Sequence, residues 1–150
     1  YLHALDAYEK CGDRSAWLRV VAEDAGVMLA ALEPERVLAW LGDCPEEMLK
    51  SAPAALLVLM RRLFSWGRCR EMLGLRQLLL EAVGNDAELD ETERGNLLGE
   101  CDLIMSFLRY NDIAGMSELH RSACRQMSRP AVSIRRHCIC RRDSSERREI

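Results

Sequence analysis

Residues that commonly perform catalysis are sparse in this chain. The three histidines, His3, His120 and His137, each lack a serine or cysteine partner that also has an orienting carboxylate. No set of nucleophile, base and charge-stabilising group can therefore be assembled from them. We expect no enzymatic activity. The alternative of an all-helical enzyme would require turnover that is lost when a single histidine or cysteine is substituted.

Two patterns of histidine and cysteine raise the question of a metal site. His120 and Cys124 are spaced i, i+4, and His137 precedes Cys138-x-Cys140. Zinc sites usually use four protein ligands, and neither pattern has a second pair to complete it. For the first pattern we instead expect His120 at the helix surface beside a buried Cys124. No metal and no cofactor are predicted for this segment.

Arginine and glutamate side chains are the best candidates for binding a ligand. Arg61, Arg62 and Arg109 fall late in two apolar segments. We expect each segment to be the first helix of a helical hairpin, and in arrays of such hairpins, as in tetratricopeptide-like proteins, the first helices line the concave face. Arginine there can bind a ligand carboxylate or phosphate through two parallel hydrogen bonds. Glu100 is a weaker candidate of the same kind. The alternative is that these arginines only complement the dipole at the C-terminal ends of helices.

The composition is that of an all-helical protein. Hydrophobic residues make up 49% of the chain, and the abundant Leu, Ala, Met, Glu and Arg favour helix over strand. The longest unbroken apolar run, Ala54–Met60, is far shorter than the roughly 20 residues that span a bilayer. Trp17, Trp40 and Trp66 fall on apolar faces, so we expect them in the core rather than in a ligand cage.

Charge is unevenly distributed along the chain. Residues 1–128 hold 14 Lys and Arg against 21 Asp and Glu, whereas residues 129–150 hold 7 Arg and 3 acidic residues. An acidic body argues against nucleic-acid binding, which needs a basic face. Residues 129–150 show no helical pattern and are predicted to be a basic, disordered tail. The seven cysteines are an odd number, typical of a reduced, cytoplasmic protein.

Apolar segments occur in pairs separated by very short connections. In the first pair, Asp13 is the expected N-cap of a helix that runs from Ser15 to Leu32. Glycine and asparagine tolerate the left-handed conformation that ends many helices, and such short connections make the two helices antiparallel. The predicted helical-repeat domain covers 1–128, with hairpins at about 2–32, 54–83 and 92–127 and turns near Gly12, Gly67 and Asn111.

The expected helix over residues 92–110 is apolar or small on two opposite sides, so we predict that it is packed on both. Gly99 costs roughly 1 kcal/mol relative to alanine inside a helix, which indicates close contact with a neighbouring helix. One side carries Leu97, Leu98, Cys101, Ile104, Met105 and Leu108, and the other carries Gly95, Gly99, Leu103 and Ser106.

The turns are 55 and 44 residues apart, which indicates a divergent array of the tetratricopeptide type. We expect antiparallel hairpins stacked as a right-handed superhelix. An insert of short helices, residues 34–51, separates the first two hairpins. Pro34, Pro45 and Pro53 are expected to start helices there, because proline is well tolerated at the first helical position.

This region resembles the central helical region of large LuxR-type transcriptional regulators of the maltose-activator (MalT-like) class. In that class a W-L-x-x-L-P-x-E-x-L…P-x-L segment introduces the sensor-domain repeats. The segments Gly67–Ala82 and Gly99–Leu119 are similar to two further helical motifs of the class. The first motif reads here as Trp40, Leu41, Cys44, Pro45, Glu47, Leu49, Pro53 and Leu56, with Cys44 replacing an apolar residue.

The resemblance implies a role in signalling. Such regulators carry an N-terminal ATPase module and a C-terminal helix-turn-helix, and this chain has neither a phosphate-binding loop nor a basic recognition helix. ATP and DNA would then be bound by parts of the regulator outside this segment. The expected function is effector sensing or signalling, with a small-molecule effector or a regulatory protein as partner and self-association possible. The alternative is a generic tetratricopeptide-like scaffold for protein–protein interaction.

Overall fold

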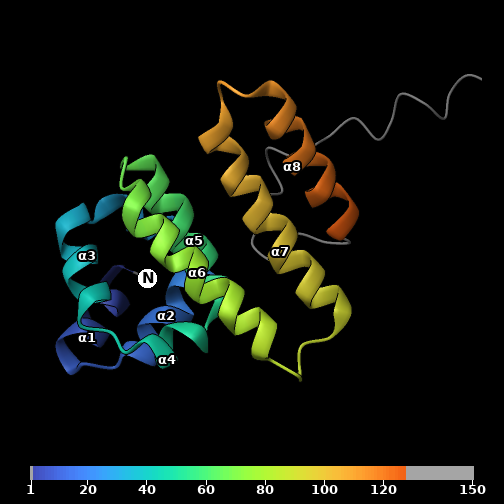
Figure 1. Ribbon diagram of the computed structural model, residues 1–150. Coiled ribbons are helices and arrows are strands. Elements are labelled where there is room, and N and C mark those ends of the chain that lie inside the picture. The colour runs from blue at the N-terminus through green and yellow to red at the C-terminus, as the bar shows by residue number, and fades with distance from the viewer. Residues whose placement is uncertain (1, 128–150) are drawn as a thin grey trace, which may run out of the picture.

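The computed structural model describes residues 2–127 (Figure 1), and the predicted tail, 129–150, lies outside the described residues. Every regular element in the described part is a helix, which confirms the all-α class. The elements are α1 (Leu2–Cys11), α2 (Arg14–Glu23), the 3-10 helix η1 (Met28–Ala31), α3 (Pro34–Gly42), α4 (Glu46–Lys50), α5 (Pro53–Ser65), α6 (Cys69–Asn85), α7 (Glu91–Ser106), the 3-10 helix η2 (Phe107–Arg109) and α8 (Ile113–Gln126).

The helices begin where the local sequence predicts. The Asp13 side chain accepts a hydrogen bond from the Ala16 amide at 3.0 Å and caps α2. Pro34 and Pro53 occupy the first positions of α3 and α5, and Pro45 immediately precedes α4. Proline therefore redirects the chain at each of these starts instead of breaking a helix.

The expected helix from Ser15 to Leu32 was wrong, because α2 ends at Glu23. Ala25 and Gly26 adopt φ angles of 51° and 76°, and the Asp24 carboxylate accepts a hydrogen bond from the Met28 amide at 2.6 Å. A Cβ on Gly26 would lie 2.5 Å from Val58 Cγ1. The turn thus lets the backbone approach α5 closely, and only glycine fits at that position.

The helix connections follow two different geometries. Gly12 and Gly67 adopt the predicted left-handed conformation, with φ angles of 70° and 72°. The same expectation for Asn111 was wrong, since Ala25 is the only non-glycine residue with a positive φ in the described part. The chain instead tightens into η2 after α7, and the Asp112 amide donates a hydrogen bond to the Arg109 carbonyl at 2.8 Å.

Helix α5 is the centre of one apolar core. It packs against α2, α4, α6 and α7, and the buried cluster extends from Leu5 on α1 to Ile104 on α7. The rings of Trp17 and Trp40 stack within this cluster with centroids 3.9 Å apart. Both tryptophans are core residues as predicted, and Trp66 is only half-buried.

Helix α7 is packed on two sides, as its sequence predicts. It lies between α8 and the α5–α6 pair (Figure 1). A Cβ on Gly95 would lie 2.6 Å from the Gln126 carbonyl oxygen, and one on Gly99 would lie 3.1 Å from the Ala123 carbonyl oxygen. Glycine therefore lets the backbones of α7 and α8 approach closely, which confirms the predicted contact at Gly99.

Candidate ligand-binding groove

A groove of about 560 Å³ opens between three helices that are far apart in the sequence. Its volume lies within the range of small-molecule pockets, about 300–1,000 Å³. Leu18 and Leu97 are buried at its floor, while Ser15, Arg19 and Glu93 are exposed at its edges. The walls come from α2, from the start of α5 and from the first half of α7.

The groove presents charges of both signs. Arg19 on α2 and Glu93 on α7 both line it, and within residues 2–127 neither side chain forms an ion pair. The residue before α5, Ala52, provides no side-chain cap, so the partial positive charge of this helix end adds to that of Arg19. Chemically, the groove suits a small ligand that carries a carboxylate and an ammonium group beside an apolar body.

Arg62 has a structural partner in this arrangement. Its guanidinium donates a hydrogen bond to the Gly26 carbonyl oxygen at 2.9 Å and lies over the Trp66 ring, 5.9 Å from the centroid. Burial lowers the pKa of Arg62, and the nearby charge of Arg61 lowers it further. Arg62 therefore fastens the end of α5 to the turn after α2, a contact that neither sequence interpretation of this residue includes.

The other candidate residues are distributed over different parts of the fold. Arg109 pairs with Asp112 at 3.2 Å inside the α7–α8 connection. Arg61 is half-buried on α5, and Glu100 is completely buried on α7. None of Arg61, Arg62, Glu100 and Arg109 lines the groove, so their binding roles stay predictions.

His120 does meet a serine, although the sequence gives it no obvious partner. Its Nε2 atom lies 2.8 Å from Ser106 Oγ. The Ser106 hydroxyl is also within hydrogen-bond distance of the Leu103 carbonyl oxygen, at 2.7 Å. Ser106 is also fully buried. The pair therefore joins α7 to α8.

The structure describes only the first of the two candidate metal-binding patterns, His120 with Cys124. Cys124 is exposed, so the expectation of a buried cysteine beside His120 was wrong: this position on α8 faces away from α7. Within residues 2–127, no three His, Cys, Asp or Glu side chains are grouped as a metal ion would require. His137, Cys138 and Cys140 lie outside the described residues.

None of the helices in the described range has the length and apolar character needed to cross a membrane. No family model matches this chain, and no curated protein or solved structure matches it either. The functional interpretation therefore depends on the residues of the chain itself and on the resemblance in its motifs.

The sequence did not point to the groove. Arg19 occurs in α2 among apolar residues that explain the helix by themselves, and Glu93 is an ordinary acidic residue in the first turn of α7. Their shared position depends on how α2, α5 and α7 pack. No spacing rule within one helix carries that information.

Proposed function

We propose that this chain is the effector-sensing or signalling helical-repeat segment of a LuxR-type, MalT-like transcriptional regulator. The order and spacing of the motifs from Trp40 to Leu119 support this proposal. The hairpins would stack as in a tetratricopeptide superhelix, and other parts of the regulator would bind ATP and DNA. The segment works in the cytoplasm in this proposal and has no catalytic activity of its own.

The groove is the observation that carries the sensing role. Its walls come from all three hairpins: α2 from the first, α5 from the second and α7 from the third. A ligand seated there would contact each of them at once. Binding would shift the regulator toward its active state if the ligand prefers the hairpin arrangement of that state.

A thermal-melt screen of the 150-residue chain tests this role. Amino acids, short peptides, sugars and small carboxylates are added at millimolar concentration. A ligand that binds only the folded state and is present at 100 times its Kd stabilises by about 2.7 kcal/mol. For a chain of this size, that raises Tm by about 5–10 °C. We expect the largest rise from ligands that carry both an ammonium and a carboxylate group.

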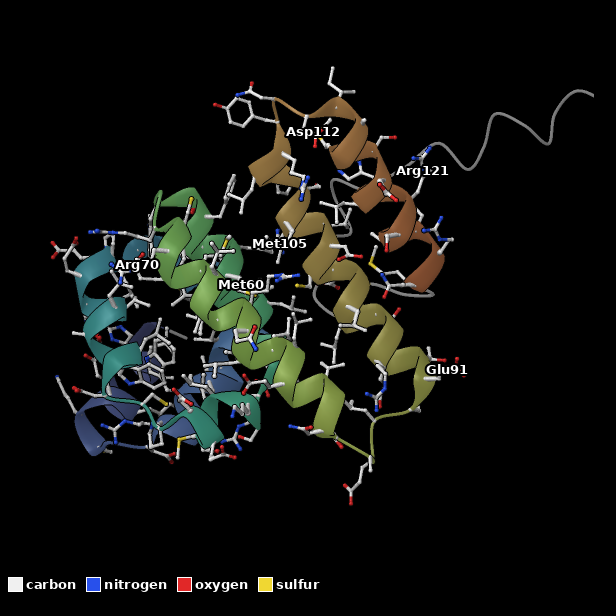
Figure 2. The ribbon with its side chains drawn as sticks, in the orientation of Figure 1. Met60, Arg70, Glu91, Met105, Asp112 and Arg121 are labelled. Atoms are coloured by element: carbon white, nitrogen blue, oxygen red, sulfur yellow. The ribbon has the colours of Figure 1, made fainter. Side chains whose placement is uncertain are left out.

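Variants of groove residues test whether a ligand-induced rise in Tm comes from binding in the groove. Arg19→Ala and Glu93→Ala change exposed side chains and should abolish the rise while leaving the melt of the free protein unchanged. Arg70→Ala is the control, since Arg70 is exposed near the start of α6 (Figure 2) and does not line the groove. A panel without any response, or a response that survives both groove variants, would contradict the sensing role.

The alternative function, a tetratricopeptide-like interaction scaffold, is favoured by a different observation. Phe107, Tyr110 and Ile113 are large apolar side chains that are more than half exposed, and they gather where α7 connects to α8. Exposed apolar patches of this kind often mark protein interaction sites.

A further inference from the structure

The charged side chains along the groove restrict the ligands that it accepts. Arg19 lies on the α2 wall and Glu93 lies on the α7 wall, so one positive and one negative charge come from two different helices. A ligand with a second anionic group would meet Glu93, and one with a second ammonium group would meet Arg19. Because like charges in contact oppose binding, the groove favours a ligand with one carboxylate and one ammonium group at separate ends.

The rest of the groove is largely aliphatic. Leu18 and Leu97 are buried at its floor, and Leu89 of the α6–α7 connection is half-buried at its side. Small apolar side chains complete the lining: Ala22, Ala52, Pro53, Ala54 and Ala55. Among the described residues that line the groove, none is aromatic, whereas nucleic-acid bases are commonly held by stacking on aromatic rings. The lining therefore suits aliphatic side chains, which gain stability by leaving water.

Two polar side chains without charge also line the groove. Asn96 is 8% exposed, and Ser15 is exposed at the edge. Their amide and hydroxyl groups both donate and accept hydrogen bonds, which matches a peptide group with its own donor and acceptor. The volume of about 560 Å³ lies in the range of pockets that enclose drug-sized ligands. Such ligands are larger than one amino acid.

We infer that the groove binds a short aliphatic peptide, of about two or three residues, with free amino and carboxyl ends. This inference rests on the sensing role proposed above and names the class of its ligand. The peptide carboxylate pairs with Arg19, and the ammonium group pairs with Glu93. Its apolar side chains contact Leu89 and Leu97, and its peptide group meets Asn96.

The α6–α7 connection holds Leu89 in place before any ligand binds. The Asp86 carboxylate accepts hydrogen bonds from the amides of Glu88 and Leu89 at 2.9 and 3.3 Å. The Arg94 guanidinium donates to the Asp86 carbonyl oxygen at 2.7 Å, and α7 begins directly after the connection, at Glu91 (Figure 2). A wall that is already ordered spares the ligand part of the entropic cost of binding. Leu89 is therefore the residue that we expect to select the size of the apolar side chain.

The test measures Kd by isothermal titration calorimetry on the full chain, with leucyl-leucine as the first probe. Three related compounds remove one feature each: N-acetyl-leucyl-leucine lacks the ammonium group, leucyl-leucine amide lacks the carboxylate, and L-leucine lacks the second residue. We expect leucyl-leucine to bind most tightly. Each of the other three should bind about 10-fold more weakly or worse, because a hydrogen bond to a charged group or an apolar side chain is lost.

Variants assign each end of the peptide to a residue. Glu93→Gln should weaken leucyl-leucine about 10-fold and should also remove the difference between the free and the acetylated peptide. Arg19→Gln should do the same for the free and the amidated peptide, since a residue and a ligand group that interact give non-additive effects. Glu88→Gln and Arg70→Gln are the matched controls, because both residues are exposed and do not line the groove.

A second pair of variants tests the apolar wall. Leu89→Ala should weaken leucyl-leucine about 5-fold and leave alanyl-alanine unchanged, because only the larger side chain reaches the removed atoms. Leu73→Ala is the control, since Leu73 is 45% exposed on α6 and does not line the groove. Its Kd values should equal those of the wild-type chain.

The possible failures separate this inference from the sensing role. Equal binding of the acetylated or amidated peptide, or an acetylation penalty that persists in Glu93→Gln, would overturn the inference. So would a groove-dependent response to L-leucine, a sugar or a dicarboxylate without binding of leucyl-leucine, although the sensing role would then stand. A panel in which no compound binds would overturn both.

Discussion

Gly74 and Gly95 both lie inside long helices, but a methyl group added to each would meet different surroundings. A Cβ on Gly74 of α6 would have no atom within 4 Å, whereas one on Gly95 of α7 would lie 2.6 Å from a backbone oxygen of α8. We expect Gly74→Ala to stabilise the protein by about 0.5–1 kcal/mol, through the higher helix propensity of alanine. Gly95→Ala should destabilise it by about 1–3 kcal/mol, because the two helices must move apart.

Urea denaturation followed by circular dichroism measures both effects. The midpoint should rise for Gly74→Ala and fall for Gly95→Ala. A rise for both variants would mean that α8 does not pack against Gly95 in solution. The close approach of α7 and α8 at Gly95 would then be absent.

At the scale of elements, α8 depends on its N-cap. Asp112 accepts a hydrogen bond from the Gly115 amide at 2.9 Å and also pairs with Arg109. These two interactions, the backbone bond first, hold the pKa of Asp112 below its ordinary value. A depressed pKa means that the folded state favours the charged form. The resulting stability is present at neutral pH and is lost as the pH falls below about 4, through the pKa of the folded state.

The pH dependence can be assigned with Asp112→Asn. Asparagine also caps helices well, but it lacks the charge that pairs with Arg109. We expect the wild-type chain to melt at a higher temperature than this variant at pH 7, and the two melting temperatures to approach each other as the pH falls below about 4. Glu118→Gln, an exposed change on α8, is the control and should give no such convergence. A constant difference between wild type and Asp112→Asn from pH 7 to pH 3 would contradict this role of Asp112.

Helix starts were more predictable than helix ends. Asp13, Pro34 and Pro53 act within one or two residues of their own position, so their effect is visible in the sequence. The end of α2 was missed because Ala22 and Glu23 are good helix formers, and the break at Gly26 is required by contact with Val58 on another helix. That contact exists only after α2 and α5 have packed together.

The same limit applies to the sites. The close helix contact at Gly99 could be predicted because glycine inside a helix lowers helix stability, and a close neighbour explains why glycine is needed there. Arg19 and Glu93 line one groove, and Phe64 stacks on Phe107, only because separate hairpins meet in space. No residue in either set has an unusual neighbour in the sequence. Sequence reasoning therefore placed its binding candidates on arginines at helix ends, and Arg62 and Arg109 bind groups of the protein itself there.

At the scale of the whole molecule, one core links the first helix to the seventh. Leu5 of α1 and Ile104 of α7 belong to the same buried cluster, although α8 contributes no residue to it. Helix α8 is joined to the molecule through α7 instead. We therefore expect residues 2–127 to unfold as one cooperative unit, since a single buried cluster joins α1 to α7 and α5 packs against α2, α4, α6 and α7.

Two probes test this cooperativity. Tryptophan fluorescence reports on α2, α3 and the end of α5 through Trp17, Trp40 and Trp66, and far-UV circular dichroism reports on all helices. Their urea transitions should coincide. Met60→Ala removes a fully buried side chain of α5 in the region where α5 and α7 approach each other (Figure 2). It should cost about 2–5 kcal/mol and lower both midpoints equally. If the circular dichroism midpoint alone fell, the α7–α8 hairpin would be a separate unit, and a ligand in the groove would bind between two units instead of within one.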